Sequence, residues 1–208
     1  DTDQNNLEKF IKKGKFFAGH NFVTHDLKYL RRLGIGSYLK DNMIIDTLYL
    51  SALLSPTEAK HAIEKDYKSV IDYKSDPLID SLKTKELFYE LEKEFNSLDN
   101  DMKEIFYNLL KDELGYTGFF KYIKYSKRNR NLEQLIKNKF NDLLCENANL
   151  KKYIKHHNIS LAFVLSFINI NKEDSLFSPW IRLNYPIVEE IIKELRNTPC
   201  ITGCIYCS

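Results

Sequence analysis

Histidine and acidic residues recur over a short part of the chain, at His20, His25, Asp26, Asp46, His61 and Asp66. Carboxylates bind divalent metal ions, and an imidazole can take a proton from water near neutral pH. Metal-dependent cleavage of a nucleic acid needs these two kinds of group. The order of the residues, with short apolar segments between them, therefore indicates a hydrolytic metal site.

Each of these residues also has a structural explanation. Asn21 fits a turn, and Asp26 fits the N-cap of a helix. Alone, His61 and Asp66 fit a solvated turn of helix. We interpret His25 and Asp46 as structural, and only the joint order of the other residues favours chemistry.

The segments that must position these residues alternate between two patterns. Apolar residues at 16–18 and 43–45 indicate two short strands. Between them, leucines at helical spacing over residues 27–33 indicate a helix that Gly34 ends. A further helix ends before Pro56, and residues 1–13 form a helix ahead of the first strand. This alternation predicts an α/β unit.

From about residue 60 the pattern is helical only. Apolar residues at three- and four-residue steps predict helices at 82–98 and 102–114. The apolar run 159–170 is too short to span a bilayer and predicts a buried helix. The fold class is therefore mostly α, with a truncated α/β part.

Two more helices are expected near the end of the chain. Asn131 and Gln134 form a capping box before a helix that extends through Leu144. Cys145 is expected on the apolar face of that helix, as a core residue. The last helix spans residues 186–195, with a proline in its first turn.

The spacing of the candidate residues resembles that of a known family. The motifs that carry the likeness are Gly19-His20-Asn21, followed after four intervening residues by Asp26-Leu27, then Asp46-Thr47-Leu48, and His61 with Asp66. They are similar to the second and third motifs of DEDDh-type 3′–5′ exonucleases, the class of RNase T and of DNA polymerase III proofreading subunits. The continuation Lys65-Asp66-Tyr67-Lys68 resembles exonuclease domains fused to RecQ-like DNA helicases. The likeness covers residues 7–98.

This resemblance implies a ribonuclease H-like fold and phosphodiester hydrolysis with two Mg²⁺ or Mn²⁺ ions. It would make His61 the catalytic base, with Asp66 binding one ion directly and Asp26 helping to position the second. His20 and Asn21 would shape the substrate-binding edge, and helix capping by Asn21 stays an equal alternative. The implied substrate is single-stranded DNA with a 3′ end, and the implied partner is a helicase domain in the same polypeptide.

The family's first motif, an Asp-x-Glu pair that supplies the central metal ligands, has no counterpart in this chain. Asp1 and Asp3 resemble it, but too few residues separate them from Asp26 to hold the opening strands of the sheet. We therefore expect a C-terminal piece of the exonuclease domain that is incomplete and inactive alone.

Three cysteines, Cys200, Cys204 and Cys207, lie close together at the end of the chain. Thiolates at this spacing can converge on zinc or an iron–sulfur cluster, with a further ligand beyond Ser208. Free thiols are the alternative. The predicted domains are thus an exonuclease part at 1–98, a helical connector at 99–199 and the start of a metal-binding segment at 200–208.

The overall composition limits the partners only weakly. A net charge of +2 neither demands nor excludes a polyanion, so contacts with a nucleic acid must come from local patches. The basic run 124–130 could bind phosphates with Tyr125 stacking on a base, or could be a solvated loop. The chain shows no signal peptide and no membrane-spanning run, so we predict a cytoplasmic protein.

Two other functions stay open at this point. The first is a non-catalytic helical interaction or connector module with a terminal cysteine metal site. The second is the N-terminal arm of a radical-SAM enzyme, whose iron–sulfur cluster uses the same cysteine spacing.

Overall fold

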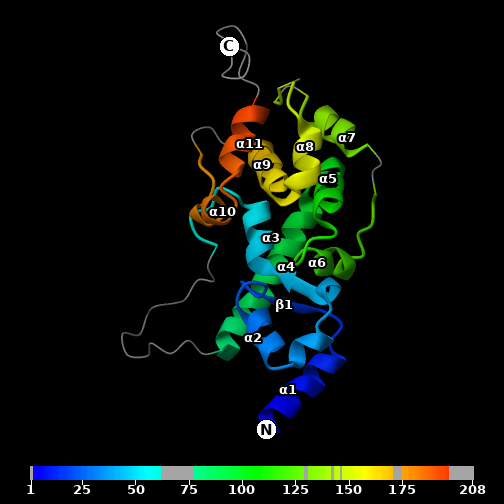
Figure 1. The fold of residues 1–208 in the computed structure, drawn as a ribbon, viewed down its shortest axis with the longest axis vertical. Coiled ribbons are helices and arrows are strands. Elements are labelled where there is room, and N and C mark those ends of the chain that lie inside the picture. The colour runs from blue at the N-terminus through cyan, green and yellow to red at the C-terminus, as the bar shows by residue number, and fades with distance from the viewer. Residues whose placement is uncertain are drawn as a thin grey trace. The chain divides into compact units, whose positions relative to one another are not determined.

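The computed structural model describes residues 2–61, 77–128, 131–141, 143–145, 147–170 and 175–196. This part of the chain is mostly helical, as predicted, and contains one two-stranded parallel sheet (Figure 1). It divides into two compact units. The first unit comprises residues 1–51, 61–97 and 111–126, and the second comprises residues 52–60, 98–110 and 127–208.

The first unit contains the predicted alternation of strand and helix. Its opening elements are α1 (Thr2–Lys13), β1 (Phe17–Gly19), α2 (Asp26–Arg32), η1 (Ile35–Tyr38), η2 (Asp41–Met43), β2 (Ile44–Asp46) and α3 (Thr47–Leu54), which continues past the unit boundary. The strands and helices predicted up to residue 54 are confirmed, with their ends shifted by no more than one residue.

The two strands are parallel, so the segment between them is a crossover connection. Phe17 of β1 pairs with Ile44 of β2, and Gly19 pairs with Asp46. A parallel pair needs a crossover of about a dozen residues or more, usually with a helix, and α2 is that helix. The carboxyl ends of both strands therefore lie side by side, at the edge where open parallel sheets bind their ligands.

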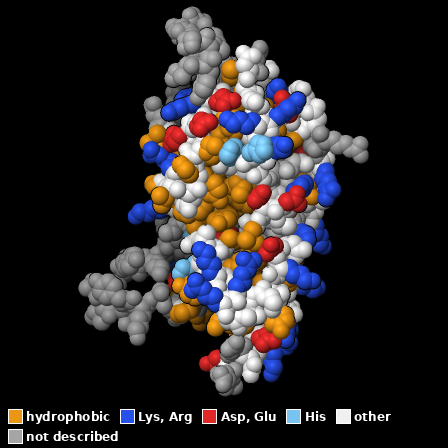
Figure 2. All heavy atoms as spheres, viewed as in Figure 1, with side chains coloured by type: hydrophobic (Ala, Val, Ile, Leu, Met, Phe, Trp, Pro, Cys, Tyr) orange, Lys and Arg blue, Asp and Glu red, His pale blue; other side chains and the backbone are white. Residues whose placement is uncertain are grey.

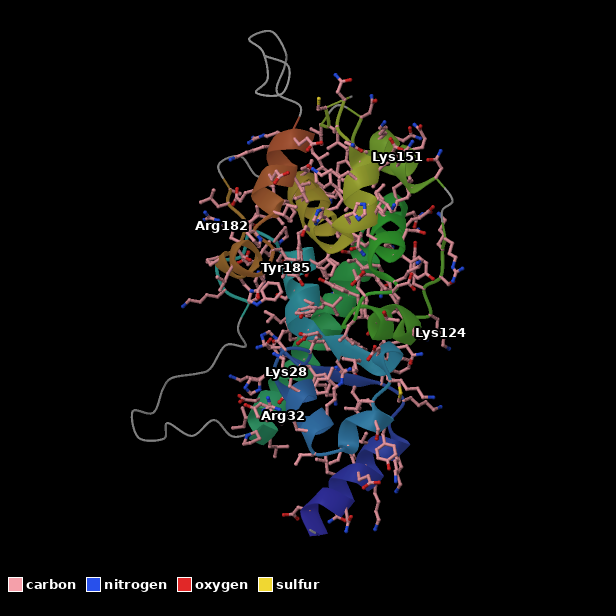
Figure 3. All side chains as sticks on the ribbon, in the orientation of Figure 1. Lys28, Arg32, Lys124, Lys151, Arg182 and Tyr185 are labelled. Carbon is pink, nitrogen blue, oxygen red and sulfur yellow. The ribbon has the colours of Figure 1, made fainter. Side chains whose placement is uncertain are left out.

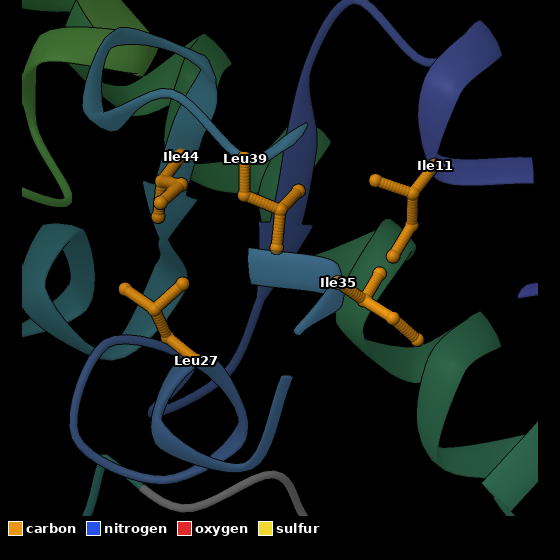
Figure 4. Close-up of a cluster of buried hydrophobic side chains, with 5 residues drawn as sticks. All are labelled: Ile11, Leu27, Ile35, Leu39 and Ile44. Atoms are coloured by element: carbon orange, nitrogen blue, oxygen red, sulfur yellow. The ribbon is translucent and has the colours of Figure 1, made fainter. Parts of the chain in front are cut away.

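A cluster of buried aliphatic side chains packs α1 and α2 against this sheet. Its members, drawn in Figure 4, are Ile11, Leu27, Ile35, Leu39 and Ile44. They come from α1, α2, η1, the loop after η1, and β2, so each element contributes one apolar position. Burial of a side chain of this size stabilises a fold by roughly 1.5–3 kcal/mol.

Helices α4 (Pro77–Ser97) and α6 (Thr117–Tyr122) complete the first unit. Rings of α4 meet rings of α6 edge to face, with centroid distances of 5.2 Å for Phe95–Phe119 and 5.0 Å for Phe88–Tyr122. Gly118 lets α6 lie directly on β2, because a Cβ atom there would be 2.3 Å from the carbonyl oxygen of Ile44.

The named elements of the second unit are all helices within its described residues. Beside residues 52–60 it contains α5 (Asn100–Leu110), α7 (Leu132–Lys139), α8 (Leu150–His156), α9 (Asn158–Ile170), α10 (Pro179–Asn184) and α11 (Val188–Leu195). Helix α9 packs against α5, α8 and α11, and its residues 160–166 are all buried. The prediction of a buried helix at this apolar run is confirmed.

The prediction of a long helix through Leu144 is wrong. Helix α7 ends at Lys139, although Asn131 caps it as predicted by accepting from the Gln134 backbone N–H at 3.2 Å. Leu144 instead forms an isolated antiparallel bridge with Arg196, and the Cys145 N–H donates to the Leu195 carbonyl. These long-range bonds replace helical ones, which leaves Cys145 half-buried and outside any helix.

Other helix ends also differ from the prediction. Helix α4 begins at Pro77, five residues before the predicted start at residue 82, and α5 begins at Asn100, two residues before its predicted start. Helix α5 stops at Leu110, since residues 111–116 form turns that lead into α6. Helix α11 starts at Val188, so Pro186 precedes the helix, where its carbonyl accepts from the Glu189 N–H at 3.3 Å.

Candidate functional site

The carboxyl ends of β1 and β2 bring together side chains that the sequence keeps far apart. His20 follows β1 directly, Thr47 follows β2 directly, and Ser51 lies one helical turn beyond Thr47 on α3. His61 is also part of this group, which we call the strand-end site: His20, Thr47, Ser51 and His61. Positions four apart share one face of a helix, so α3 presents two hydroxyl groups on the same side.

Thr47 fixes the imidazole of His20. The Nδ1 atom of His20 is 3.1 Å from the Thr47 hydroxyl oxygen, and that hydroxyl also donates to the Gly19 carbonyl at 3.3 Å. A hydroxyl has one proton, so Thr47 can donate to Gly19 and accept from His20 at the same time. The His20 ring is thereby held in one orientation against the end of the sheet.

The electrostatics of His20 place it next to His61. Burial lowers the pKa of His20, the charge of His61 lowers it further, and a hydrogen bond to the His61 backbone partly offsets both effects. A lowered pKa keeps the imidazole neutral at physiological pH. Two predicted site residues, one substrate-binding and one catalytic, are therefore neighbours.

Ser51 holds the ring of His61. Its hydroxyl oxygen lies 2.9 Å from His61 Nδ1, and the His61 side chain is buried. The prediction of an imidazole on a solvated turn, the structural alternative for His61, is wrong. Proton transfer by a ring held at Nδ1 would use its other nitrogen, Nε2.

Asp46 organises the loop after β1. Its carboxylate is fully buried and accepts the backbone N–H groups of Asn21 at 3.1 Å, Val23 at 2.9 Å and Leu48 at 3.0 Å. Burial raises the pKa of Asp46 to about 6, and the bonds from backbone N–H groups pull it in the opposite direction. The bonds to Asp46 wrap the loop around the strand end, which agrees with the structural role inferred for this residue.

Asn21 is the turn residue of that loop. Its backbone has a φ of 59°, in the left-handed region that asparagine tolerates better than most residues. Its side-chain oxygen accepts from the Thr24 hydroxyl, and its carbonyl accepts from the His25 N–H at 3.1 Å. Helix α2 has His25 at its N-cap position, so Asn21 does not cap it.

Asp26 lies apart from the strand-end site's hydrogen bonds. It opens α2, its side chain is 53% exposed, and its carboxylate is 3.7 Å from His25 Nδ1. Across the described ranges, no three or more His, Cys, Asp or Glu side chains are arranged to hold a metal ion. A site with two divalent ions would thus need further carboxylates besides Asp26.

Several predicted ligands are not among the residues that the structure describes. Asp66, the predicted direct ligand of a divalent ion, and the cysteines Cys200, Cys204 and Cys207 lie outside the described residues. The same holds for the end of the basic run, at residues 129–130. Within that run, the Tyr125 ring packs edge to face on Phe95, with centroids 6.0 Å apart. Since this contact occupies part of the half-buried ring, it disfavours the prediction that Tyr125 stacks on a base.

Thr47 and Ser51 were not predicted as site residues. The signal for Thr47 and Ser51 was a pair of hydroxyls four residues apart directly after a strand. That signal is weak, because serine and threonine near a helix start usually form local bonds to the backbone. What distinguishes this pair is that each hydroxyl meets a histidine from a distant part of the chain.

Within the described ranges, every helix is too short or too polar to serve as a membrane span. Comparison of the chain with models of known protein families, with curated proteins and with solved structures finds no match. The function must therefore be inferred from the residues of the chain itself.

Proposed function

We propose that the strand-end site is part of a nuclease that hydrolyses phosphodiester bonds with divalent metal ions. The observation that supports this most directly is the buried His61, held at Nδ1 by Ser51 beside His20 at the carboxyl ends of two parallel strands. The proposed activity is that of a 3′–5′ exonuclease of ribonuclease H-like type, and the proposed setting is a longer polypeptide with a RecQ-like helicase domain.

His61 has the chemistry of a general base in this proposal. Hydrolysis requires a group that takes a proton from the attacking water, and histidine does this efficiently near neutral pH. A base must also be held in a fixed orientation, since misplacement by about 1 Å can cost roughly 100-fold in rate. The hydrogen bond between the Ser51 hydroxyl and His61 Nδ1, together with the packing around the buried ring, supplies that constraint.

The acidic residues would supply oxygen ligands. Carboxylates are the ligands that Mg²⁺ and Mn²⁺ prefer, and Asp26 has an exposed carboxylate directly after the loop that carries His20 and Asn21. In this proposal Asp66 and carboxylates from the family's first motif complete the set. The metal ions would stabilise the negative charge that develops on the phosphate.

The test is hydrolysis of a 5′-labelled single-stranded DNA by the full-length polypeptide with Mg²⁺ or Mn²⁺. His61→Ala is expected to abolish the loss of nucleotides from the 3′ end, while the circular dichroism spectrum is unchanged. His156→Ala is a matched control, since His156 is an exposed histidine at the end of α8 in the second unit. Full activity in the His61→Ala protein would refute the nuclease.

A second candidate function is a helical connector without catalytic activity, and the second unit favours it. Buried polar groups there serve structure: Ser178 caps α10 by accepting from the Ile181 N–H, Ser166 donates to the Leu53 carbonyl, and Glu104 pairs with Lys127. If this function is correct, His61→Ala changes nothing and metal content depends on Cys200, Cys204 and Cys207 alone.

A further inference from the structure

One face of α2 is formed by cations and aromatic rings. An α-helix turns by about 100° per residue, so His25, Lys28, Tyr29 and Arg32 lie within about 100° of one another around the axis. All of them are exposed, whereas Leu27, on the opposite side of the helix, is buried. Figure 2 shows Lys and Arg side chains gathered over α2, and Figure 3 places Lys28 and Arg32 on this helix. We call these residues the α2 basic face: His25, Lys28, Tyr29 and Arg32.

Lys28 and Arg32, the two permanent charges of this face, are not neutralised by the residues that the structure describes, whereas the His25 imidazole lies 3.7 Å from the Asp26 carboxylate. Among those residues, no carboxylate lies within ion-pair distance of Lys28 or Arg32. Arg31 differs, because its guanidinium is 3.1 Å from the Asp41 carboxylate on another side of the helix. The α2 basic face therefore offers two cations to a polyanion, and Arg31 is already paired.

Tyr29 adds an exposed ring between the cations. Its side chain is 55% exposed, the His25 ring lies 5.4 Å away, and the Arg32 guanidinium lies 5.8 Å from the ring centroid. Proteins that bind single-stranded nucleic acids combine cations that follow the backbone with aromatic rings on which bases stack. Cations alone would suit any anionic surface, whereas the ring between them favours a nucleic acid.

We propose that the α2 basic face binds single-stranded nucleic acid, with Lys28 and Arg32 on phosphates and Tyr29 stacked on a base. This deepens the proposed function and rests on it, because the loop of residues 20–25 joins α2 directly to the strand-end site. A strand bound along α2 would be held beside that site. Hydrolysis is not needed to measure this binding.

The experiment uses fluorescence anisotropy of a labelled dT oligonucleotide with the 208-residue chain in EDTA, so that no strand is cut. The K28A/R32A double variant is expected to bind more weakly. Its slope of log affinity against log salt should be smaller by about 1.4, since each phosphate contact with a single strand contributes about 0.7. Tyr29→Ala should weaken binding about tenfold, and Tyr29→Phe should bind fully.

Arg31→Ala is the matched control, because it removes the same charge from the same helix but from a paired position. It should keep the wild-type salt slope, and circular dichroism should show that all variants are folded. The proposal would be overturned if R31A lost as much affinity for the oligonucleotide as the double variant. It would also be overturned if the chain bound anionic lipid vesicles but did not bind the oligonucleotide. Binding is measured without hydrolysis, so a strand that is bound by the wild-type protein but never cut when Mg²⁺ or Mn²⁺ is present would count against the nuclease alone.

Discussion

At the scale of single residues, the strand-end site depends on hydroxyl groups that orient two histidines. Thr47 and Ser51 come from the same face of α3, and each bonds to the Nδ1 atom of a different imidazole. Hydrogen bonding at one ring nitrogen determines which nitrogen is left to exchange protons. Ser51 is therefore a positioning residue for His61 in the proposed reaction.

Ser51→Ala is expected to release the His61 ring without removing it. In the 208-residue chain, ¹⁵N NMR of the imidazole should show a change in the protonation state of His61 Nδ1. In the longer polypeptide of the proposed function, the proposed nuclease activity should fall by about 10- to 100-fold, because the base is no longer held in place. Ser51→Thr keeps the hydroxyl and should restore both. A Ser51→Ala protein with an unchanged NMR spectrum would show that Ser51 does not orient His61.

Asp46 gives the stability of the first unit a specific pH dependence. Burial raises the pKa of Asp46 from 3.8 to about 6 in the folded state, so the native protein binds this proton more tightly than the unfolded chain. The contribution of Asp46 to the free energy of unfolding is therefore fully present below about pH 4 and is lost as pH rises to about 6. The shift in pKa makes this contribution about 3 kcal/mol at its largest.

Urea unfolding of wild type and Asp46→Asn at several pH values would measure this contribution. The variant has no titrating group at this position. The difference in free energy of unfolding between the two proteins should therefore vary between pH 4 and 6 and be constant above that range. Burial lowers the pKa of His20, so the stability that this residue contributes is lost as pH falls, opposite to the contribution of Asp46. Both proteins contain His20, so its contribution cancels when their free energies of unfolding are subtracted. A constant difference across this range would contradict a raised pKa for Asp46.

At the scale of elements, the close contact of α6 with β2 depends on a glycine. A Cβ atom on residue 118 would lie 2.3 Å from the Ile44 carbonyl oxygen, which belongs to backbone and cannot move aside. Gly118→Ala is expected to destabilise the protein by about 1–3 kcal/mol, as overpacking does. Thermal unfolding would measure the loss.

Gly34→Ala is the comparison for this variant. Its φ of 76° strains any other residue, but a Cβ atom there would have no neighbour within 4 Å. The cost should be about 1 kcal/mol, from backbone strain alone. If Gly118→Ala costs no more than Gly34→Ala, then α6 does not pack on β2 as closely as the structure shows.

The elements were predictable where a local pattern decides them. The spacing of apolar residues, with Gly34 and Pro56 as helix-ending residues, correctly predicted β1, α2, β2 and α3. Each of these signals lies within or next to the element that it specifies. Leu144 and Cys145 could not be placed in this way, since their backbone bonds go to Leu195 and Arg196. Similarly, the partnership of Ser51 with His61 depends on how the chain returns to α3, and no spacing in the sequence encodes it.

At the scale of the whole molecule, the two units are interleaved along the chain. Residues 111–126 return to the first unit after α5 has entered the second. Tyr116, Phe119 and Phe120 belong to this returning segment and are buried, with Tyr116 donating a hydrogen bond to the Tyr49 carbonyl. A cut near residue 98 would therefore remove part of the core of the first unit.

A chain truncated to residues 1–98 is expected not to fold, although this range contains the strand-end site and the resemblance to exonucleases. Removal of each buried aromatic ring costs about 3–5 kcal/mol of folding free energy. The loss of several rings therefore exceeds the net stability of a small unit. Circular dichroism and the dispersion of amide NMR signals should show an unfolded chain, whereas the 208-residue chain serves as the folded reference. A cooperative thermal transition in the truncated chain would contradict this arrangement.

The buried carboxylate of Asp46 also bears on how quickly the backbone exchanges its hydrogens with solvent. The amides of Asn21 and Val23 lie in a loop, where exchange is ordinarily fast, yet both donate to a side chain that is closed off from water. Their exchange then requires the strand end to open, not merely the loop to fluctuate. In deuterated water these two amides should persist as long as those of a strand, and Asp46→Asn should shorten their lifetimes selectively.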